Sequence, residues 1–183
     1  MARVLVPLAQ GCEELEAVTI IDLLRRAEIE VVSAGLEEGP VTASRGVMLV
    51  PDTTLAQAMA QEFDMVVLPG GLPGAERLGR DERVRDLLLR MAGSGKFTAA
   101  ICAGPKVLAA AGLLDGRSAT SYPGHLDNFP RVKLMSAPVV TDGKVITSRG
   151  PGTAMDFALT LIETLRGKSV RDSVEQALVR ASA

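Results

Sequence analysis

Thiols and imidazoles are scarce in this sequence, whose 183 residues include two cysteines, Cys12 and Cys102, and one histidine, His125. Two cysteines are too few for a disulfide scaffold, so a reducing compartment would keep both as free thiols. Neither a CxxC nor an HExxH spacing is present, and we therefore expect no metal and no other cofactor. The chemical question is which of the two thiols is reactive.

Long apolar runs and one-sided charge are also missing. No stretch of about 18 apolar residues or signal-peptide core occurs, so we expect a cytoplasmic protein that does not enter a membrane. The 20 basic and 22 acidic residues are interspersed and give a net charge of −2. Without a basic stripe to neutralise phosphates, nucleic acid is not an expected partner.

What the sequence does contain is an alternation of short apolar runs with helical patterns, free of repeats or linkers. Strands are predicted at residues 3–9, 30–34, 63–68, 97–101 and 119–122, and helices at 14–26, 80–91, 105–114, 153–166 and 169–180. A small two-stranded excursion is predicted over 41–50, and a hairpin at 138–141 and 144–148. This order predicts one α/β domain over residues 1–183, with a mostly parallel sheet covered on both faces.

Cys102 lies in the turn between a predicted buried strand and a helix. In open parallel sheets ligands bind beyond the carboxyl ends of the strands, where the loops 10–16, 69–75 and 102–105 should converge. A nucleophile in such a turn faces helix N–H groups, which we expect to lower the thiol pKa. The alternative is a core cysteine that acts as a small apolar residue, and position alone leaves both open.

Four motifs carry a family resemblance. They are AAICAGP at 99–105, LPGG at 68–71 followed by Gly74 and Ala75, EELE at 13–16, and TSRGPGT at 147–153. In this order they resemble the ThiJ/PfpI superfamily, and within it the DJ-one branch, over essentially the whole chain. The resemblance implies a flavodoxin-like three-layer sandwich and a homodimer, with residues 147–151 as a possible contact.

The same resemblance assigns site residues. It implies Cys102 as nucleophile and Glu16 as the carboxyl that hydrogen-bonds its sulfur, with backbone donors at Gly70, Gly71 and Ala103. Helical spacing alone would favour a solvated carboxylate at position 16, and we interpret the neighbouring Glu13 and Glu14 as exposed first-turn acids.

A thiolate beside a proton-shuttling carboxyl suits addition to a carbonyl followed by proton transfer. We therefore expect a cofactor-independent enzyme that converts methylglyoxal to lactate without glutathione, or removes such aldehydes from glycated proteins. For this work the Glu16 pKa must be raised, which burial would do.

Several positions depart from the family pattern or have two interpretations. Ala103 stands where peptidase-like members have a histidine, which excludes an adjacent dyad. Tyr122 replaces a histidine of the branch; its hydroxyl either reaches over the crevice or is buried against a carbonyl. His125 is either solvated or turns toward the nucleophile. Arg45 and Arg149 match family positions near the site entrance. Their guanidinium groups either bind an anionic group of the substrate or have a structural role.

Two other functions remain open. Cys102 could be a redox sensor, or part of a chaperone, whose oxidation is the signal, with Cys12 as a resolving thiol if the two sulfurs come within reach. A cysteine peptidase or amidase is the third interpretation, weakened by the missing adjacent base.

Overall fold

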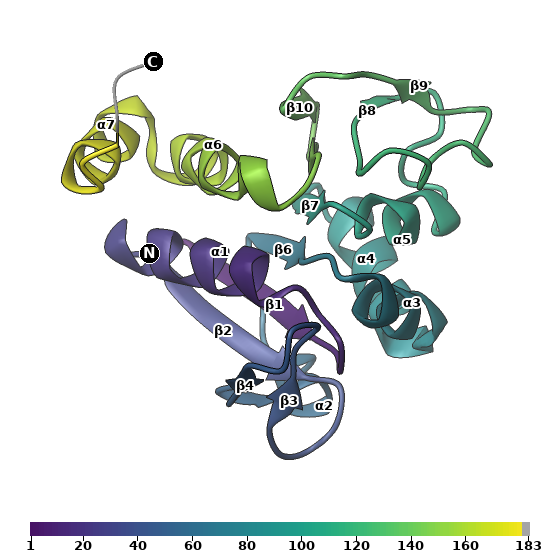
Figure 1. Cartoon of the computed structure of the whole chain (residues 1–183), viewed down its shortest axis with the longest axis horizontal. Helices are drawn as coiled ribbons and strands as arrows, with labels where there is room; N and C mark the ends of the chain where they lie inside the picture. Colours follow the sequence, from purple (N-terminus) through teal and green to yellow (C-terminus); the bar gives the residue numbers. More distant parts are fainter. Residues whose placement is uncertain (181–183) are drawn as a thin grey trace.

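A seven-stranded sheet forms the centre of the computed structural model, which describes residues 1–180 (Figure 1). The strand order is β10-β11-β7-β6-β1-β2-β5, and only β10 runs antiparallel to its neighbour. The strands are β1 (Arg3–Leu8), β2 (Glu30–Gly35), β5 (Thr53–Thr54), β6 (Met65–Leu68), β7 (Phe97–Ile101), β10 (Val139–Asp142) and β11 (Val145–Ser148).

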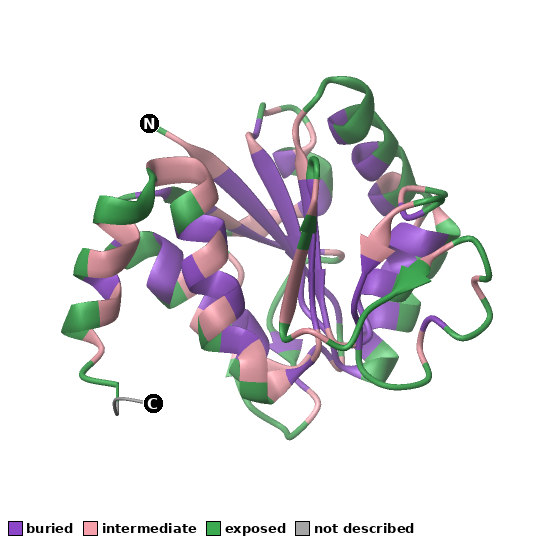
Figure 2. Ribbon diagram, turned by 90° about the horizontal axis from the view of Figure 1, so that it is seen from above, coloured by how far each residue is buried: buried purple, intermediate pink, exposed green. Residues whose placement is uncertain are grey.

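Helices cover both faces of this sheet, so the strands are buried between two layers (Figure 2). One layer consists of α1 (Glu14–Arg26), α6 (Ala154–Arg166) and α7 (Lys168–Ala177). The other consists of α2 (Leu55–Ala58), α3 (Leu72–Arg80), α4 (Glu82–Gly93) and α5 (Pro105–Ala110). A single 3-10 turn, η1 (Pro151–Thr153), leads into α6. This is the predicted three-layer α/β architecture.

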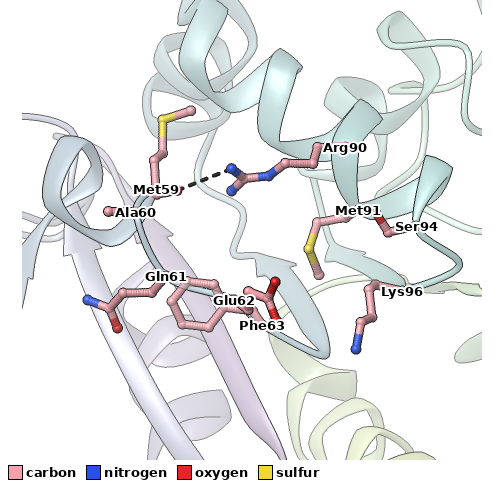
Figure 3. A pocket seen from close by; sticks show the side chains of 9 residues that line it. All are labelled: Met59, Ala60, Gln61, Glu62, Phe63, Arg90, Met91, Ser94 and Lys96. Carbon is pink, nitrogen blue, oxygen red and sulfur yellow. Dashed lines mark hydrogen bonds between the residues drawn. The ribbon is translucent and has the colours of Figure 1, made fainter.

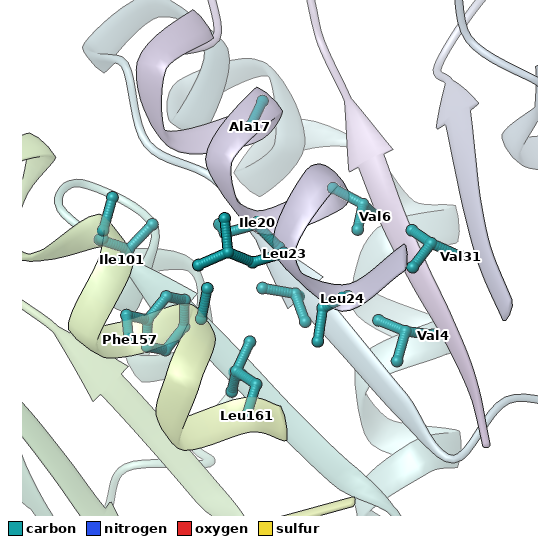
Figure 4. Close-up of a cluster of buried hydrophobic side chains, with 14 of the residues drawn as sticks. Val4, Val6, Ala17, Ile20, Leu23, Leu24, Val31, Ile101, Phe157 and Leu161 are labelled. Carbon is teal, nitrogen blue, oxygen red and sulfur yellow. The ribbon is translucent and has the colours of Figure 1, made fainter. Parts of the chain in front are cut away.

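The alternation of side chains along the strands explains why the central strands are apolar throughout. Val4 and Val6 of β1 contribute to the core under α1 and α6, whereas Leu5 contributes to the opposite core. Figure 4 shows the first core, where Ile20 of α1 and Phe157 of α6 lie over the sheet. Both faces of the central strands β1, β6 and β7 therefore exclude water.

Small antiparallel elements also match expectation. The excursion at 41–50 forms β3 (Val41–Thr42) and β4 (Met48–Leu49), and the predicted hairpin forms β10 and β11. The central strands begin and end within about two residues of their predicted limits.

Two sequence predictions of secondary structure are wrong, and one helix was not predicted. The helix predicted at 80–91 is α4, which begins at Glu82 because Asp81 is extended and its side chain caps the helix through the N–H of Arg83. Helix α3 (Leu72–Arg80) lies before it and was not predicted. The helix predicted at 105–114 already ends at Ala110. The strand predicted at 119–122 is only β8 (Ser118–Ala119), which pairs outside the main sheet with β9 (Lys133–Leu134).

Candidate active site

Cys102 occupies a strained turn at the carboxyl end of β7. Its φ of 63° lies in the left-handed region, which costs an L-residue about 1–2 kcal/mol. Two backbone hydrogen bonds hold this conformation: the Cys102 N–H donates to the Ser148 carbonyl at 3.0 Å, and the Tyr122 N–H donates to the Cys102 carbonyl at 2.9 Å. Cys102 is only partly buried, in contrast to the fully buried Cys12.

Glu16 projects from the first turn of α1 and is fully buried. Its Oε2 accepts a hydrogen bond of 2.7 Å from the Gly70 N–H, while Oε1 has no hydrogen-bond partner within residues 1–180. Burial raises the pKa of this carboxyl to about 7, despite the opposing effects of the Gly70 N–H and the Cys102 thiol. The burial and raised pKa that the chemistry requires are therefore present.

Glycine at position 70 allows the carboxyl and the thiol to meet. A Cβ built on Gly70 would lie 2.6 Å from Glu16 Oε2, 2.6 Å from Cys102 Cβ and 3.0 Å from Cys102 Sγ. Any side chain there would separate the two groups. The Gly70 N–H is committed to Glu16. The backbone donors that face the sulfur are therefore those of Gly71 and Ala103.

The pKa of the Cys102 thiol does not follow the sequence expectation. Burial and the negative charge of Glu16 raise it to about 12, although the Gly71 and Ala103 N–H groups act in the opposite direction. The expected lowering by helix N–H groups is wrong, because burial, the largest cause, and the charge of Glu16 together outweigh those groups. Because neighbouring groups titrate as a pair, we interpret Glu16 and Cys102 as sharing one proton near neutral pH. A thiolate forms when Glu16 holds that proton.

The three loops converge as predicted. The Glu13 N–H donates to the Gly70 carbonyl at 2.9 Å, and the Gly74 N–H donates to the Gly11 carbonyl at 3.2 Å. Gly71 has a φ of 87°, and a Cβ there would lie 2.5 Å from the Gly11 carbonyl oxygen. Loop 10–16 and loop 69–75 thus interlock directly beside Cys102.

Glu13 and Glu14 are not the freely exposed acids that the sequence suggested. Both are half-buried, and both accept a hydrogen bond from the Ser44 hydroxyl, at 2.9 and 3.0 Å respectively. Glu14 also accepts from the Arg45 N–H. These contacts fix the β3–β4 excursion to the start of α1, so both acids have a structural role.

Tyr122 and His125 lie on the loop after β8, where their rings meet edge to face with centroids 5.9 Å apart. Tyr122 is 49% exposed, which contradicts a buried tyrosine satisfied by a carbonyl. Burial, and then the charge of Lys106, lower the pKa of His125, so its imidazole is neutral at pH 7. A backbone hydrogen bond, from the Tyr122 N–H to the Cys102 carbonyl, links this pair to Cys102.

The remaining predicted residues lie around this centre. Arg45 is exposed and its backbone is bound to α1, whereas Arg149 donates through Nη1 to the Ser136 carbonyl at 2.9 Å. Arg149 also lines a pocket of about 500 Å³ that includes Ser121.

Cys12 is fully buried, and burial followed by the charge of Glu14 raises its pKa to about 11. The raised pKa leaves little Cys12 thiolate, which is the form in which a resolving cysteine attacks.

Ser148 was missed by sequence reasoning. Its carbonyl fixes the Cys102 N–H, and its hydroxyl donates to the Pro138 carbonyl at 2.8 Å. The residue belongs to the TSRGPGT motif, but a backbone acceptor leaves no signature in residue type. Thr147 and Ser148 are also buried within the chain, which removes them from the suggested dimer contact.

A pocket of about 300 Å³ lies at the opposite edge of the sheet, near the beginning of β7 (Figure 3). It holds no thiol, and Arg90 spans it with a hydrogen bond of 3.1 Å to the Met59 carbonyl.

Within the described part of the chain there is no group of three or more His, Cys, Asp or Glu side chains suited to a metal. Over the same residues, no helix combines the length and apolarity needed to cross a membrane.

Comparisons with known proteins agree with this geometry. The model of the DJ-1/PfpI family matches residues 2–164, and the chain belongs to that family. It is 47% identical to protein dj-1beta of Drosophila melanogaster, over 97% of this chain and 96% of that protein. The crystal structure of that fly protein superposes with a TM-score of 0.95 at 46% identity, covering 99% of each chain. The glutathione-independent glyoxalase DJR-1.2 of Caenorhabditis elegans is 36% identical, over 98% of this chain and 96% of that protein.

Proposed function

We propose that this protein is a glutathione-independent glyoxalase that converts methylglyoxal and water to lactate. The observation that carries the proposal is the contact between the Cys102 thiol and the buried carboxyl of Glu16, whose pKa of about 7 lets it both donate and accept a proton near neutral pH. The kinship with a worm glyoxalase supports the same reaction class.

In the first step the Cys102 sulfur bonds to the aldehyde carbon and the carbonyl π electrons move to oxygen. The proton shared by Cys102 and Glu16 passes to that oxygen, giving a hemithioacetal. The Gly71 and Ala103 N–H groups, which face the sulfur, are placed to stabilise negative charge as it moves from sulfur to oxygen.

In the second step Glu16, now a carboxylate, removes the proton from the former aldehyde carbon, and the electron pair moves to the ketone oxygen to give an enediolate. Glu16 returns this proton to the neighbouring carbon, and the hydroxyl proton of the hemithioacetal passes to the former ketone oxygen, which yields a thioester of lactate on Cys102. One water then hydrolyses the thioester and restores the thiol. The aldehyde carbon is oxidised while the ketone carbon is reduced, so no external oxidant, reductant or cofactor is needed.

The test is direct detection of lactate from methylglyoxal without glutathione, since thiols also bind aldehydes reversibly. Wild type and Cys12→Ser are expected to produce lactate at similar rates. Cys102→Ser and Glu16→Gln should lower kcat/KM by at least about a hundredfold, the scale of lost nucleophilic or acid–base catalysis. No lactate from wild type would refute the proposal. Removal of methylglyoxal from glycated protein, the deglycase reaction, should depend on the same two residues.

We also propose a second copy of this chain as a partner. Apolar side chains are exposed on α1 and on the β3–β4 excursion, namely Leu15, Val18, Val47, Met48 and Val50. The hydrogen bonds from Ser44 and Arg45 to the start of α1 bring these two elements together. Exposed apolar residues that cluster in this way are typical of a subunit interface.

A further inference from the structure

A groove between α3 and α5 begins beside the nucleophile. The two helices lie side by side (Figure 1), each following one of two adjacent parallel strands. The groove has a volume of about 230 Å³, and Ala103, which supplies a donor to the Cys102 sulfur, is part of its wall. Leu72, which follows the other donor Gly71, is part of the opposite wall.

The wall residues recur at helical spacing. On α3 they are Leu72, Ala75, Glu76, Gly79 and Arg80, and on the segment leading into α5 they are Ala103, Lys106, Val107 and Ala110. Each set follows one face of a helix, so the groove runs along both helices away from the sulfur. The span from residue 72 to residue 80 is about 12 Å at the rise of an α-helix.

The floor of the groove is apolar and its charges are at the rim. Ala75, Ala103 and Val107 are buried, whereas Glu76, Arg80 and Lys106 are exposed. A cavity of about 150 Å³ lined by apolar side chains can hold a benzene ring, so the volume of this groove suffices for a group of that size.

We infer that this groove is a subsite for the apolar substituent of a 2-oxoaldehyde whose aldehyde carbon is bonded to Cys102. The inference rests on the proposed function and names its substrate class: aryl or alkyl 2-oxoaldehydes of about six or more substituent carbons, in addition to methylglyoxal. The methyl group of methylglyoxal is too short to reach the far part of the groove, near Gly79. Contacts with the floor then distinguish the larger substrates from the smaller one.

Gly79 offers a way to block the groove without touching the catalytic groups. It is helical, and a Cβ built there would lie 3.6 Å from Val107 Cγ2, an ordinary contact. A methyl group is therefore accommodated, and a longer side chain extends into the groove. Gly93, the last residue of α4, is a matched control: it is a helical glycine whose Cβ would meet nothing within 4 Å.

The experiment compares kcat/KM for phenylglyoxal and methylglyoxal in wild type, Gly79→Ala, Gly79→Leu and Gly93→Leu. Gly79→Leu should lower the value for phenylglyoxal about tenfold, the scale of a hydrophobic-pocket contact, and change that for methylglyoxal by less than about twofold. Gly79→Ala, which favours the helix and so secures folding, should show the same selectivity more weakly. Gly93→Leu should change neither.

Equal effects on both substrates, or none, would overturn the groove as a subsite while leaving the glyoxalase proposal intact. A change of molecular mass in Gly79→Leu without a change of selectivity would identify the groove as a protein contact and overturn the inference as well. If wild type converts neither aldehyde, the proposed function itself fails, and the subsite fails with it.

Discussion

Glu16 and Cys102 are coupled through one proton, and this coupling links the site to folding. The carboxyl is buried with one unpartnered oxygen, which disfavours its ionised form. Its folded-state pKa of about 7 exceeds the ordinary value of 4.5. The folded protein therefore holds a proton that the unfolded chain releases between those two pH values.

This difference predicts a pH-dependent stability. The contribution from protonated Glu16 is fully present below pH 4.5 and is lost as pH rises through about 7. Relative to wild type, Glu16→Gln should therefore gain about 3 kcal/mol in free energy of unfolding between pH 4 and pH 8. Urea denaturation at a series of pH values measures this. A difference between Glu16→Gln and wild type that stays constant over this pH range would contradict the raised pKa of Glu16.

Gly71 combines a left-handed backbone with close contacts, and a second glycine separates the two effects. Gly46 has a φ of 91°, similar to the 87° of Gly71, but a Cβ there would meet nothing within 4 Å. Gly46→Ala should lower the free energy of unfolding by about 1 kcal/mol, the cost of the left-handed conformation. Gly71→Ala should cost about 2 kcal/mol more, because its Cβ would clash with the Gly11 carbonyl. Equal losses would show that the two loops do not interlock as described.

Cys12 is expected to stay reduced when Cys102 is oxidised. Both thiols have raised pKa values, so exposure is what distinguishes them. Cys12 is fully buried, whereas Cys102 is only partly buried and adjoins the Glu16 carboxyl that can take its proton. Of the two cysteines, peroxide should therefore add oxygen atoms only to Cys102. Peptide mass spectrometry detects this and separates it from oxidation of the exposed methionines, and the Cys102→Ser variant should gain no oxygen at position 102. Loss of two hydrogens together with a peptide joining both cysteines would instead establish Cys12 as a resolving thiol.

Among the elements, α1 and α6 show how the layer that carries Glu16 is held. Phe157 of α6 is fully buried against the core that includes Ile20 of α1. Phe157→Ala should lower the free energy of unfolding by about 3–5 kcal/mol, the usual cost of removing a buried aromatic ring. Met155, on the same helix but about half exposed, is the control, and Met155→Ala should cost less than about 0.5 kcal/mol. Chemical denaturation measures the free energy of unfolding of both variants, and equal losses would contradict the prediction.

The elements also show what sequence patterns could predict. The central strands were predictable because they are buried on both faces and read as continuous apolar runs. Helix α3 was not, because Pro73, Gly74 and Gly79 are poor helix formers. Gly74 is required by packing, since a Cβ there would lie 2.6 Å from the Cys12 Cα. That contact joins residues far apart in sequence and leaves no local signal.

The site was predictable to a similar degree. The strand-to-helix position made Cys102 a candidate without deciding its role, and the family motifs identify both Cys102 and Glu16. The direction of the Cys102 pKa shift was not predictable, because tertiary packing determines both the burial of the thiol and the approach of a carboxyl from another helix. The exposure of Tyr122 likewise depends on where the chain turns after β8, and the hydrogen bond from its N–H to Cys102 determines that turn.

At the scale of the whole molecule, the sheet edge that carries Cys102 and the exposed apolar surface share one element. Helix α1 carries Glu16 on its buried face and Leu15 and Val18 on its exposed face. A second copy bound to that exposed face would cover apolar side chains and fix the helix that positions the carboxyl. The proposed dimer would therefore stabilise the site without having to contribute a catalytic group.

This arrangement predicts a dimer that two charges can break. Light scattering of wild type should give twice the chain mass of 19.2 kDa at micromolar concentration. The double variant Val18→Glu with Met48→Glu should give the monomer mass, because two carboxylates would be buried without partners in the interface. Leu89→Glu, at an exposed apolar position on α4 in the opposite layer, should remain dimeric. A wild-type monomer would refute the dimer, and a dimer that persists in the double variant would place the interface on another surface.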